Sequence, residues 1–169
     1  LTLSIPDDAS NEDKVGLALG AGATGSGLNV TFASHLVSGD PSPGNRTTGV
    51  SLVDGATLED STVRLYSSNV NDAVAVYGSG NVVESSLTAF RDVYQGNATG
   101  TVEIKRSALT AIGGGAVTEG GTLNMRDSVI LNPFGGVGVS AESYEGPANV
   151  LIDGSTILGA PGTTGATVL

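Results

Sequence analysis

The 169-residue chain contains no cysteine, no tryptophan and only one histidine, His35. Without cysteine, neither a disulfide framework nor a thiolate metal site can form. A single histidine excludes a metal centre built from several histidines and leaves one position for any histidine-based triad. The sequence therefore offers no thiolate nucleophile or ligand and at most one imidazole.

Basic residues and long apolar segments are scarce as well. Seven Lys and Arg stand against 17 Asp and Glu, which gives a formal net charge of −10. The resulting field repels phosphate backbones and anionic lipid, so we expect neither a nucleic-acid partner nor insertion into a membrane. No apolar run approaches the roughly 20 residues that span a bilayer. Because the chain starts at Leu1 and not at methionine, we expect a processed or trimmed product. We expect the protein to be secreted or displayed on a cell surface.

The chain is rich in glycine and carries a regularly recurring serine. Its 26 glycines favour many short strands joined by tight turns, and the glycine-rich stretches 20–27 and 113–115 are interpreted as turns. Five serines recur at spacings of 21 to 27 residues, a period typical of a solenoid whose repeats each make one coil. These serines are Ser61, Ser85, Ser107, Ser128 and Ser155.

Two apolar columns accompany the serines. An apolar residue stands three positions before each serine and another stands two positions after it, with polar residues between, as in strands with one buried face. The columns are Leu58, Val82, Ile104, Met125 and Ile152, and Val63, Leu87, Leu109, Ile130 and Ile157. An earlier coil fits the same frame if Val30, Phe32 and Val37 take the apolar positions and His35 replaces the serine.

A second strand is expected in most coils, at residues 50–52, 74–76, 116–117, 137–139 and 166–168. Over roughly residues 25–169, coils of this kind resemble the right-handed parallel β-helix of the pectin-lyase-like superfamily. The resemblance implies an all-β, right-handed parallel β-solenoid of about six to seven coils, with the serines stacked in a ladder at the corners. Residues 1–24 are expected to form an N-terminal cap and first strands, and the whole chain is expected to be one domain.

Charged residues precede the serines and would become neighbours on successive coils. Asp60, Glu84, Arg106 and Asp127 form one such column, and Glu59, Lys105, Arg126 and Asp153 form a second. Our preferred interpretation is a solvated charge row whose exposed ion pairs each contribute about 0.2–1 kcal/mol.

The superfamily resemblance also implies a catalytic alternative, because its enzymes cleave acidic polysaccharides with carboxylates or with a calcium-assisted basic group. Asp60 and Glu84, one coil apart, would be about 5 Å from each other, a spacing compatible with a retaining carboxylate pair. Arg64 and Arg91 are the candidates for the cationic group of such a site, and Asp92, beside Arg91 in the chain, is a further catalytic candidate. Incidental calcium binding would involve Asp54, Glu59 and Asp60. Apart from that calcium, no cofactor is expected.

A ligand-binding surface is a further candidate. Tyrosine rings can stack on sugars while arginines bind hydroxyls or carboxylates, and the candidate residues are Arg64, Tyr66, Arg91, Asp92 and Tyr94, with Tyr144 in the loop 140–148. The alternative is that Tyr66 and Phe90 stack on each other at the coil edge. An outward column of Arg64, Thr88, Thr110, Leu131 and Leu158 has too few threonines to favour an ice-binding row.

The expected function is a structural, adhesive or glycan-binding module without turnover, with a polysaccharide or surface glycan as its partner. The first alternative is a polysaccharide-degrading enzyme, either pectate-lyase-like or glycoside-hydrolase-like, that uses the candidate residues named above. A second alternative is an assembly unit that associates end to end through its C-terminal coil, since no polar cap follows the last apolar strand.

Overall fold

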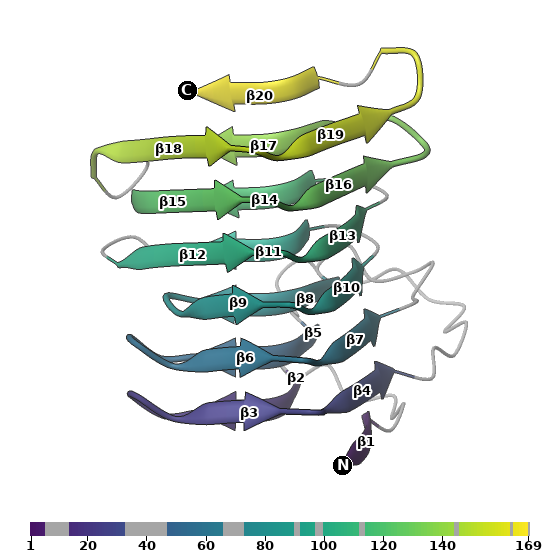
Figure 1. Ribbon diagram of the computed structural model, residues 1–169, viewed down its shortest axis with the longest axis vertical. Helices are drawn as coiled ribbons and strands as arrows, with labels where there is room; N and C mark the ends of the chain where they lie inside the picture. The colour runs from purple at the N-terminus through teal and green to yellow at the C-terminus, as the bar shows by residue number, and fades with distance from the viewer. Residues whose placement is uncertain are drawn as a thin grey trace.

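The chain winds into a column of stacked coils (Figure 1). The computed structural model describes residues 1–5, 14–32, 47–65, 73–89, 92–96, 100–111, 114–143, 146–162 and 164–168, and all regular structure within them is β-strand. Strands pair in parallel with the equivalent strands of the neighbouring coils. The predicted all-β parallel β-solenoid is therefore confirmed.

Three parallel sheets form the walls of the column. Sheet A contains β1 (Thr2–Ile5), β4 (Asn29–Phe32), β7 (Thr62–Leu65), β10 (Ser86–Ala89), β13 (Ala108–Ala111), β16 (Val129–Asn132) and β19 (Thr156–Gly159). Sheet B contains β2 (Lys14–Leu19), β5 (Thr47–Leu52), β8 (Ala73–Gly78), β11 (Asp92–Gly96), β14 (Gly114–Thr118), β17 (Val137–Ala141) and β20 (Thr164–Val168). Sheet C contains β3 (Thr24–Ser26), β6 (Thr57–Glu59), β9 (Asn81–Val83), β12 (Thr101–Lys105), β15 (Gly121–Arg126) and β18 (Ala148–Asp153).

The two predicted apolar columns line the core. The column that begins at Leu58 runs in register along sheet C, and the column that begins at Val63 runs in register along sheet A. Their members are fully buried except in the last coil, where Ile152 is 40% exposed. Burial of each such side chain stabilises the fold by about 1.5–3 kcal/mol, so these columns supply much of the driving force for coiling.

Sheet B contains the predicted second strands, and each of these strands is interrupted at one position. In all six pairs of neighbouring strands, the residues of one column are not paired with each other. This column includes Gly49, Ala75, Gly115 and Gly138. Glycine inside a strand often marks such a bend. As a result consecutive residues are buried: Ala75 and Val76 are both 0% exposed.

The serines form a hydrogen-bonded ladder at the corner between sheets C and A. The N–H of Ser61, Ser85, Ser107 and Ser128 each donates to the Oγ of the next serine, at 3.1–3.2 Å. Each Oγ in turn donates to the carbonyl oxygen two residues earlier, at 2.6–3.0 Å. The predicted stacking of the serines is therefore confirmed. Each buried serine finds its hydrogen-bond acceptor in the serine of the next coil.

The residue before each serine turns the corner. Asp60, Glu84, Arg106 and Asp127 have φ angles of 46–49°, in the left-handed region, and Gly154 takes the same position with φ 56°. A non-glycine residue in this region costs roughly 1–2 kcal/mol. The hydrogen bonds of the serine ladder hold these residues in that conformation, because they fix the chain on both sides of the turn.

Replacing Ser85 with alanine should lower the free energy of unfolding by about 1–3 kcal/mol, because the buried Ser61 N–H loses its acceptor. The Val83 carbonyl loses one donor but keeps the Asp60 N–H. The neighbouring Ser86 faces outward and is half-buried, so Ser86→Ala is a matched control with an expected change below about 0.5 kcal/mol. Urea denaturation of both variants measures the difference. Equal losses would mean that the ladder does not contribute to stability.

The first coil departs from the predicted frame. Leu28, not His35, takes the serine position, since its N–H donates to Ser61 Oγ at 3.1 Å and Gly27 before it has φ 63°. Val30 accordingly pairs with Val63, and Phe32 pairs with Leu65. The prediction for this coil was wrong because more residues separate β4 from β5 than separate the equivalent strands of other coils, which shifts the spacing. His35 and Val37 lie outside the described residues.

The N-terminal segment continues the column. β1 pairs with β4 in sheet A, β2 pairs with β5 in sheet B, and β3 pairs with β6 in sheet C. The stretch 20–27, interpreted as a turn, thus contains the short strand β3 as well as a turn at residues 21–22. In the same way Gly114 and Gly115 belong to strand β14 and not to a turn.

Candidate functional site

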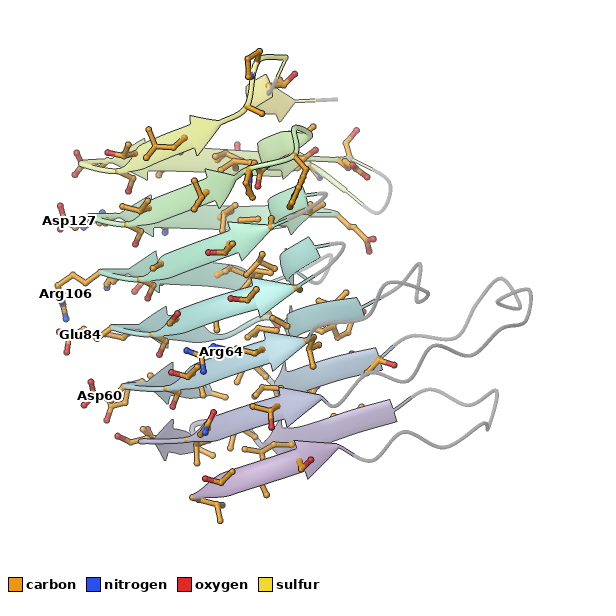
Figure 2. All side chains as sticks on the ribbon, turned by 90° about the vertical axis from the view of Figure 1, so that its right-hand side faces the viewer. Asp60, Arg64, Glu84, Arg106 and Asp127 are labelled. Carbon is orange, nitrogen blue, oxygen red and sulfur yellow. The ribbon has the colours of Figure 1, made fainter. Side chains whose placement is uncertain are left out.

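Sheet A presents two columns of side chains to solvent, which together we call the A face (Figure 2). The first column follows the serine position and contains Thr2, Asn29, Thr62, Ser86, Ala108, Val129 and Thr156. The second contains Ser4, Thr31, Arg64, Thr88, Thr110, Leu131 and Leu158. The predicted register of the second column from Arg64 onward is confirmed. The first column was missed, although its members directly follow the serine row.

The A face changes character along the column. Toward the N-terminal end it carries mostly the hydroxyl groups of serine and threonine, and toward the C-terminal end it becomes apolar. Val129, Leu131 and Leu158 are 41%, 40% and 52% exposed. The only ionisable side chain in the two columns is Arg64, in a chain with a formal net charge of −10. The A face is therefore a nearly uncharged surface on a strongly acidic molecule.

Arg64 lies in the hydroxyl-rich half of the A face. Its side chain is exposed and makes no hydrogen bond or ion pair with any residue that the structure describes. Thr31 and Thr88 flank it in the same column, about 4.8 Å away along the stack. A guanidinium group in this setting can donate several hydrogen bonds to the oxygen atoms of a ligand.

The predicted carboxylate pair lies on the corner and not on the A face. In Figure 2, Asp60, Glu84, Arg106 and Asp127 lie in a line along one edge of the column. Arg106 Nε is 2.7 Å from Glu84 Oε1, and both side chains are about half exposed. Glu84 is thus engaged by a cation from the next coil, which favours the charge row over a free carboxylate pair.

The second charged column follows the predicted register on sheet C, with Glu59 on β6 and Lys105, Arg126 and Asp153 on β12, β15 and β18. Val83 of β9 stands between Glu59 and Lys105. Lys105 Nζ forms its ion pair with Glu103 of its own strand, at 2.5 Å. Exposed pairs of this kind contribute little to stability, so the corner is mainly a hydrated border of the A face.

The candidate ligand cluster does not come together as predicted. Tyr94 belongs to sheet B and is 0% exposed, so the expectation that its ring meets a ligand at the surface is wrong. Asp92 begins β11 on the same sheet, away from Arg64 on sheet A. Tyr66, Arg91 and Tyr144 lie outside the described residues.

The acidic residues considered for calcium do not gather either. Asp54 and Asp60 lie at opposite ends of β6, and Asp54 accepts a hydrogen bond from Ser79 Oγ. Among the described residues, no three acidic or histidine side chains are grouped in a way that could hold a metal ion. Asp54, Glu59 and Asp60 therefore do not form a ligand set.

No protein-family model matches the chain, and no curated protein matches its sequence. Within the described part of the chain, no helix is long and apolar enough to cross a membrane.

Proposed function

We propose that this chain is a non-catalytic glycan-binding module of a secreted or cell-surface protein, and that the A face is its contact surface. The observation that carries the proposal is the contrast between the A face, with Arg64 as its only ionisable side chain, and the acidic remainder of the molecule. A flat surface of hydroxyl and methyl groups suits a ligand that is itself uncharged and rich in hydroxyl groups. Neutral polysaccharides have this chemistry.

The dimensions of the A face suit an extended ligand. Seven strands about 4.8 Å apart give a stack roughly 29 Å long. Every strand between the two end strands of sheet A is paired in parallel on both sides, so its side chains are presented in a rigid array. A rigid array lowers the entropy cost of binding, which compensates in part for the absence of a deep pocket.

The absence of turnover in this proposal is supported by the separation of the candidate catalytic groups. Glu84 is paired with Arg106 at the corner, while Arg64 lies on the A face and Asp92 lies on sheet B.

We further propose that the chain belongs to the pectin-lyase-like superfamily. Three parallel sheets per coil and the serine ladder support that assignment.

A matched pair of substitutions tests the A face. Thr88→Glu places a hydrated carboxylate in the middle of the face, whereas Thr122→Glu places the same group on the outside of sheet C. The new carboxylate would lie beside Arg64 in the same column, so it engages the guanidinium group and adds a hydrated charge to the contact surface. Thr88→Glu should therefore weaken binding to a neutral polysaccharide at least about tenfold. Thr122→Glu should change binding less than about twofold, although it alters the net charge equally.

The measurement is affinity electrophoresis through gels that contain mixed-linkage β-glucan, galactomannan or amylose, with the polymer length determined afterwards. Retardation of the wild type and of Thr122→Glu, but not of Thr88→Glu, supports the proposal. If the wild type is retarded by none of these polymers, the glycan proposal fails. If any polymer becomes shorter, the absence of turnover is contradicted and the enzymatic alternative takes its place.

A further inference from the structure

Phe134 is an unusually exposed aromatic residue at the edge of sheet A. It lies two residues beyond the end of β16, and 75% of its surface is exposed to solvent. Tyr94, by contrast, is 0% exposed. Single exposed apolar residues are common, but this one adjoins a larger apolar area, and such areas mark interaction sites.

The turn that carries Phe134 is fixed by specific contacts. Gly135 N–H donates to the Asn132 carbonyl oxygen at 3.4 Å, which closes a β-turn with Pro133 and Phe134 at its centre. Asn132 is fully buried, and its Nδ2 donates to the Val137 carbonyl oxygen at 2.9 Å across the base of the turn. Phe134 is therefore held at the surface by a structured turn.

The glycines after Phe134 are required by this geometry. Gly135 and Gly136 have φ angles of 95° and 109°, which side chains other than glycine rarely adopt. A Cβ atom at Gly135 would meet no atom within 4 Å, so the glycine serves the backbone conformation and not close packing. The local sequence thus directs the chain to present one aromatic ring outside the column.

Phe134 adjoins the apolar end of the A face. Leu131 lies three residues before it on β16, and Leu158 is the register partner of Leu131 on β19. Their exposed fractions are 40% and 52%. The hydroxyl-bearing members of the same columns, Thr88 and Thr110, follow without interruption on the preceding strands. The A face therefore offers first hydroxyl groups and then apolar side chains, and Phe134 stands on the turn that directly follows the apolar strand β16.

We propose that Phe134, together with Leu131 and Leu158, forms an apolar platform that binds the C–H face of a pyranose ring in a neutral glycan chain. A pyranose combines a face of C–H groups with hydroxyl groups at its rim, so a chain of such rings matches both halves of this surface. Aromatic rings contribute large apolar areas to such contacts at a low cost in conformational entropy. This inference rests on the proposed function and names a binding subsite for it.

Two substitutions at Phe134 test the platform. Phe134→Ala should weaken binding to the retarding polysaccharide about tenfold, and Phe134→Trp should preserve or strengthen binding because it keeps a flat ring. Leu151→Ala is the matched control, since Leu151 is 61% exposed on sheet C, outside the A face. All three variants should keep the wild-type melting temperature, because these side chains contribute little to the core.

The Phe134→Trp variant also supplies a direct signal, because the chain has no tryptophan of its own. Addition of soluble mixed-linkage β-glucan or galactomannan should shift the indole emission of this variant to shorter wavelength, whereas the emission of Leu151→Trp should not respond. A wild type that binds glycan, with equal binding by Phe134→Ala and unchanged emission from Phe134→Trp, would overturn the platform but leave the proposed function intact. A blue shift that depends on protein concentration alone would overturn it in favour of self-association.

Discussion

Replacing Gly115 with alanine should lower the melting temperature by about 6–12 °C. A Cβ atom at this position would lie 2.3 Å from the carbonyl oxygen of Gly138 and 2.7 Å from Cγ2 of Ile130. The carbonyl belongs to the backbone of β17, which cannot retreat without weakening its pairing with β14. We therefore expect a loss of about 3 kcal/mol or more, and about 2–4 °C per kcal/mol for a domain of this size.

The control for this prediction lies in the same column. Gly165 is placed one coil beyond Gly138, as the pairing of Val137 with Thr164 and of Val139 with Ala166 shows. A Cβ atom on Gly165 would meet nothing within 4 Å. Gly165→Ala should therefore change the melting temperature by less than about 2 °C. If thermal denaturation shows similar losses for both variants, the cause is the loss of glycine itself and not the close approach of β14 and β17.

The sequence predicted sheets C and A well because their strands obey a simple period. Residues such as Leu58 and Val63 stand at constant distances from the serine, and the serine is needed at each coil to accept the N–H of the preceding corner. Backbone hydrogen bonding and core burial thus impose the same spacing. A pattern fixed by two independent requirements can be read without a structure.

Sheet B was harder to predict because a bend disturbs the alternation. Val93 and Tyr94 are adjacent in β11, and both are 0% exposed, so a period of two does not describe the strand. Gly115 was interpreted as part of a turn because glycine usually marks turns, but here it permits the close approach of two strands. The expectation that Tyr94 belongs to a surface ligand cluster fails for the same reason, because no alternation marks its side chain as inward-facing.

The candidate site could be predicted only in part. The register of Arg64 and Thr88 follows from the serine period, which places them on one outward column. The same period places Glu84 beside Arg106 of the next coil, as the preferred charge row requires, although the 2.7 Å ion pair itself depends on side-chain geometry. The exposure of Phe134 likewise depends on the contacts of Asn132 within its turn, which have no recurring pattern in the sequence.

Replacing Tyr94 with alanine should be the most damaging single change, with a loss of about 4–6 kcal/mol and a fall in melting temperature of about 8–24 °C. The ring is the largest fully buried side chain among the described residues, and truncation of an aromatic core residue alone costs about 3–5 kcal/mol. Its hydroxyl donates to the Gly78 carbonyl oxygen at 3.0 Å and accepts from Gly80 N–H at 3.3 Å. Loss of these bonds leaves buried backbone groups without a partner.

The variant Tyr94→Phe separates the hydroxyl from the ring, and we expect it to cost about 1–3 kcal/mol at neutral pH. Burial raises the pKa of Tyr94 in the folded protein above the value of about 10 for an unfolded chain. Folding therefore favours the protonated hydroxyl, so this contribution is complete below pH 10 and is lost as the pH rises above it. Each pH unit above 10 should lower the free energy of unfolding of the wild type by about 1.4 kcal/mol through this group. Tyr94→Phe lacks the hydroxyl and should not show this loss. Denaturant titrations at pH 8, 10 and 11 should show the two proteins converging, and a constant difference would mean that the hydroxyl titrates as it does in the unfolded chain.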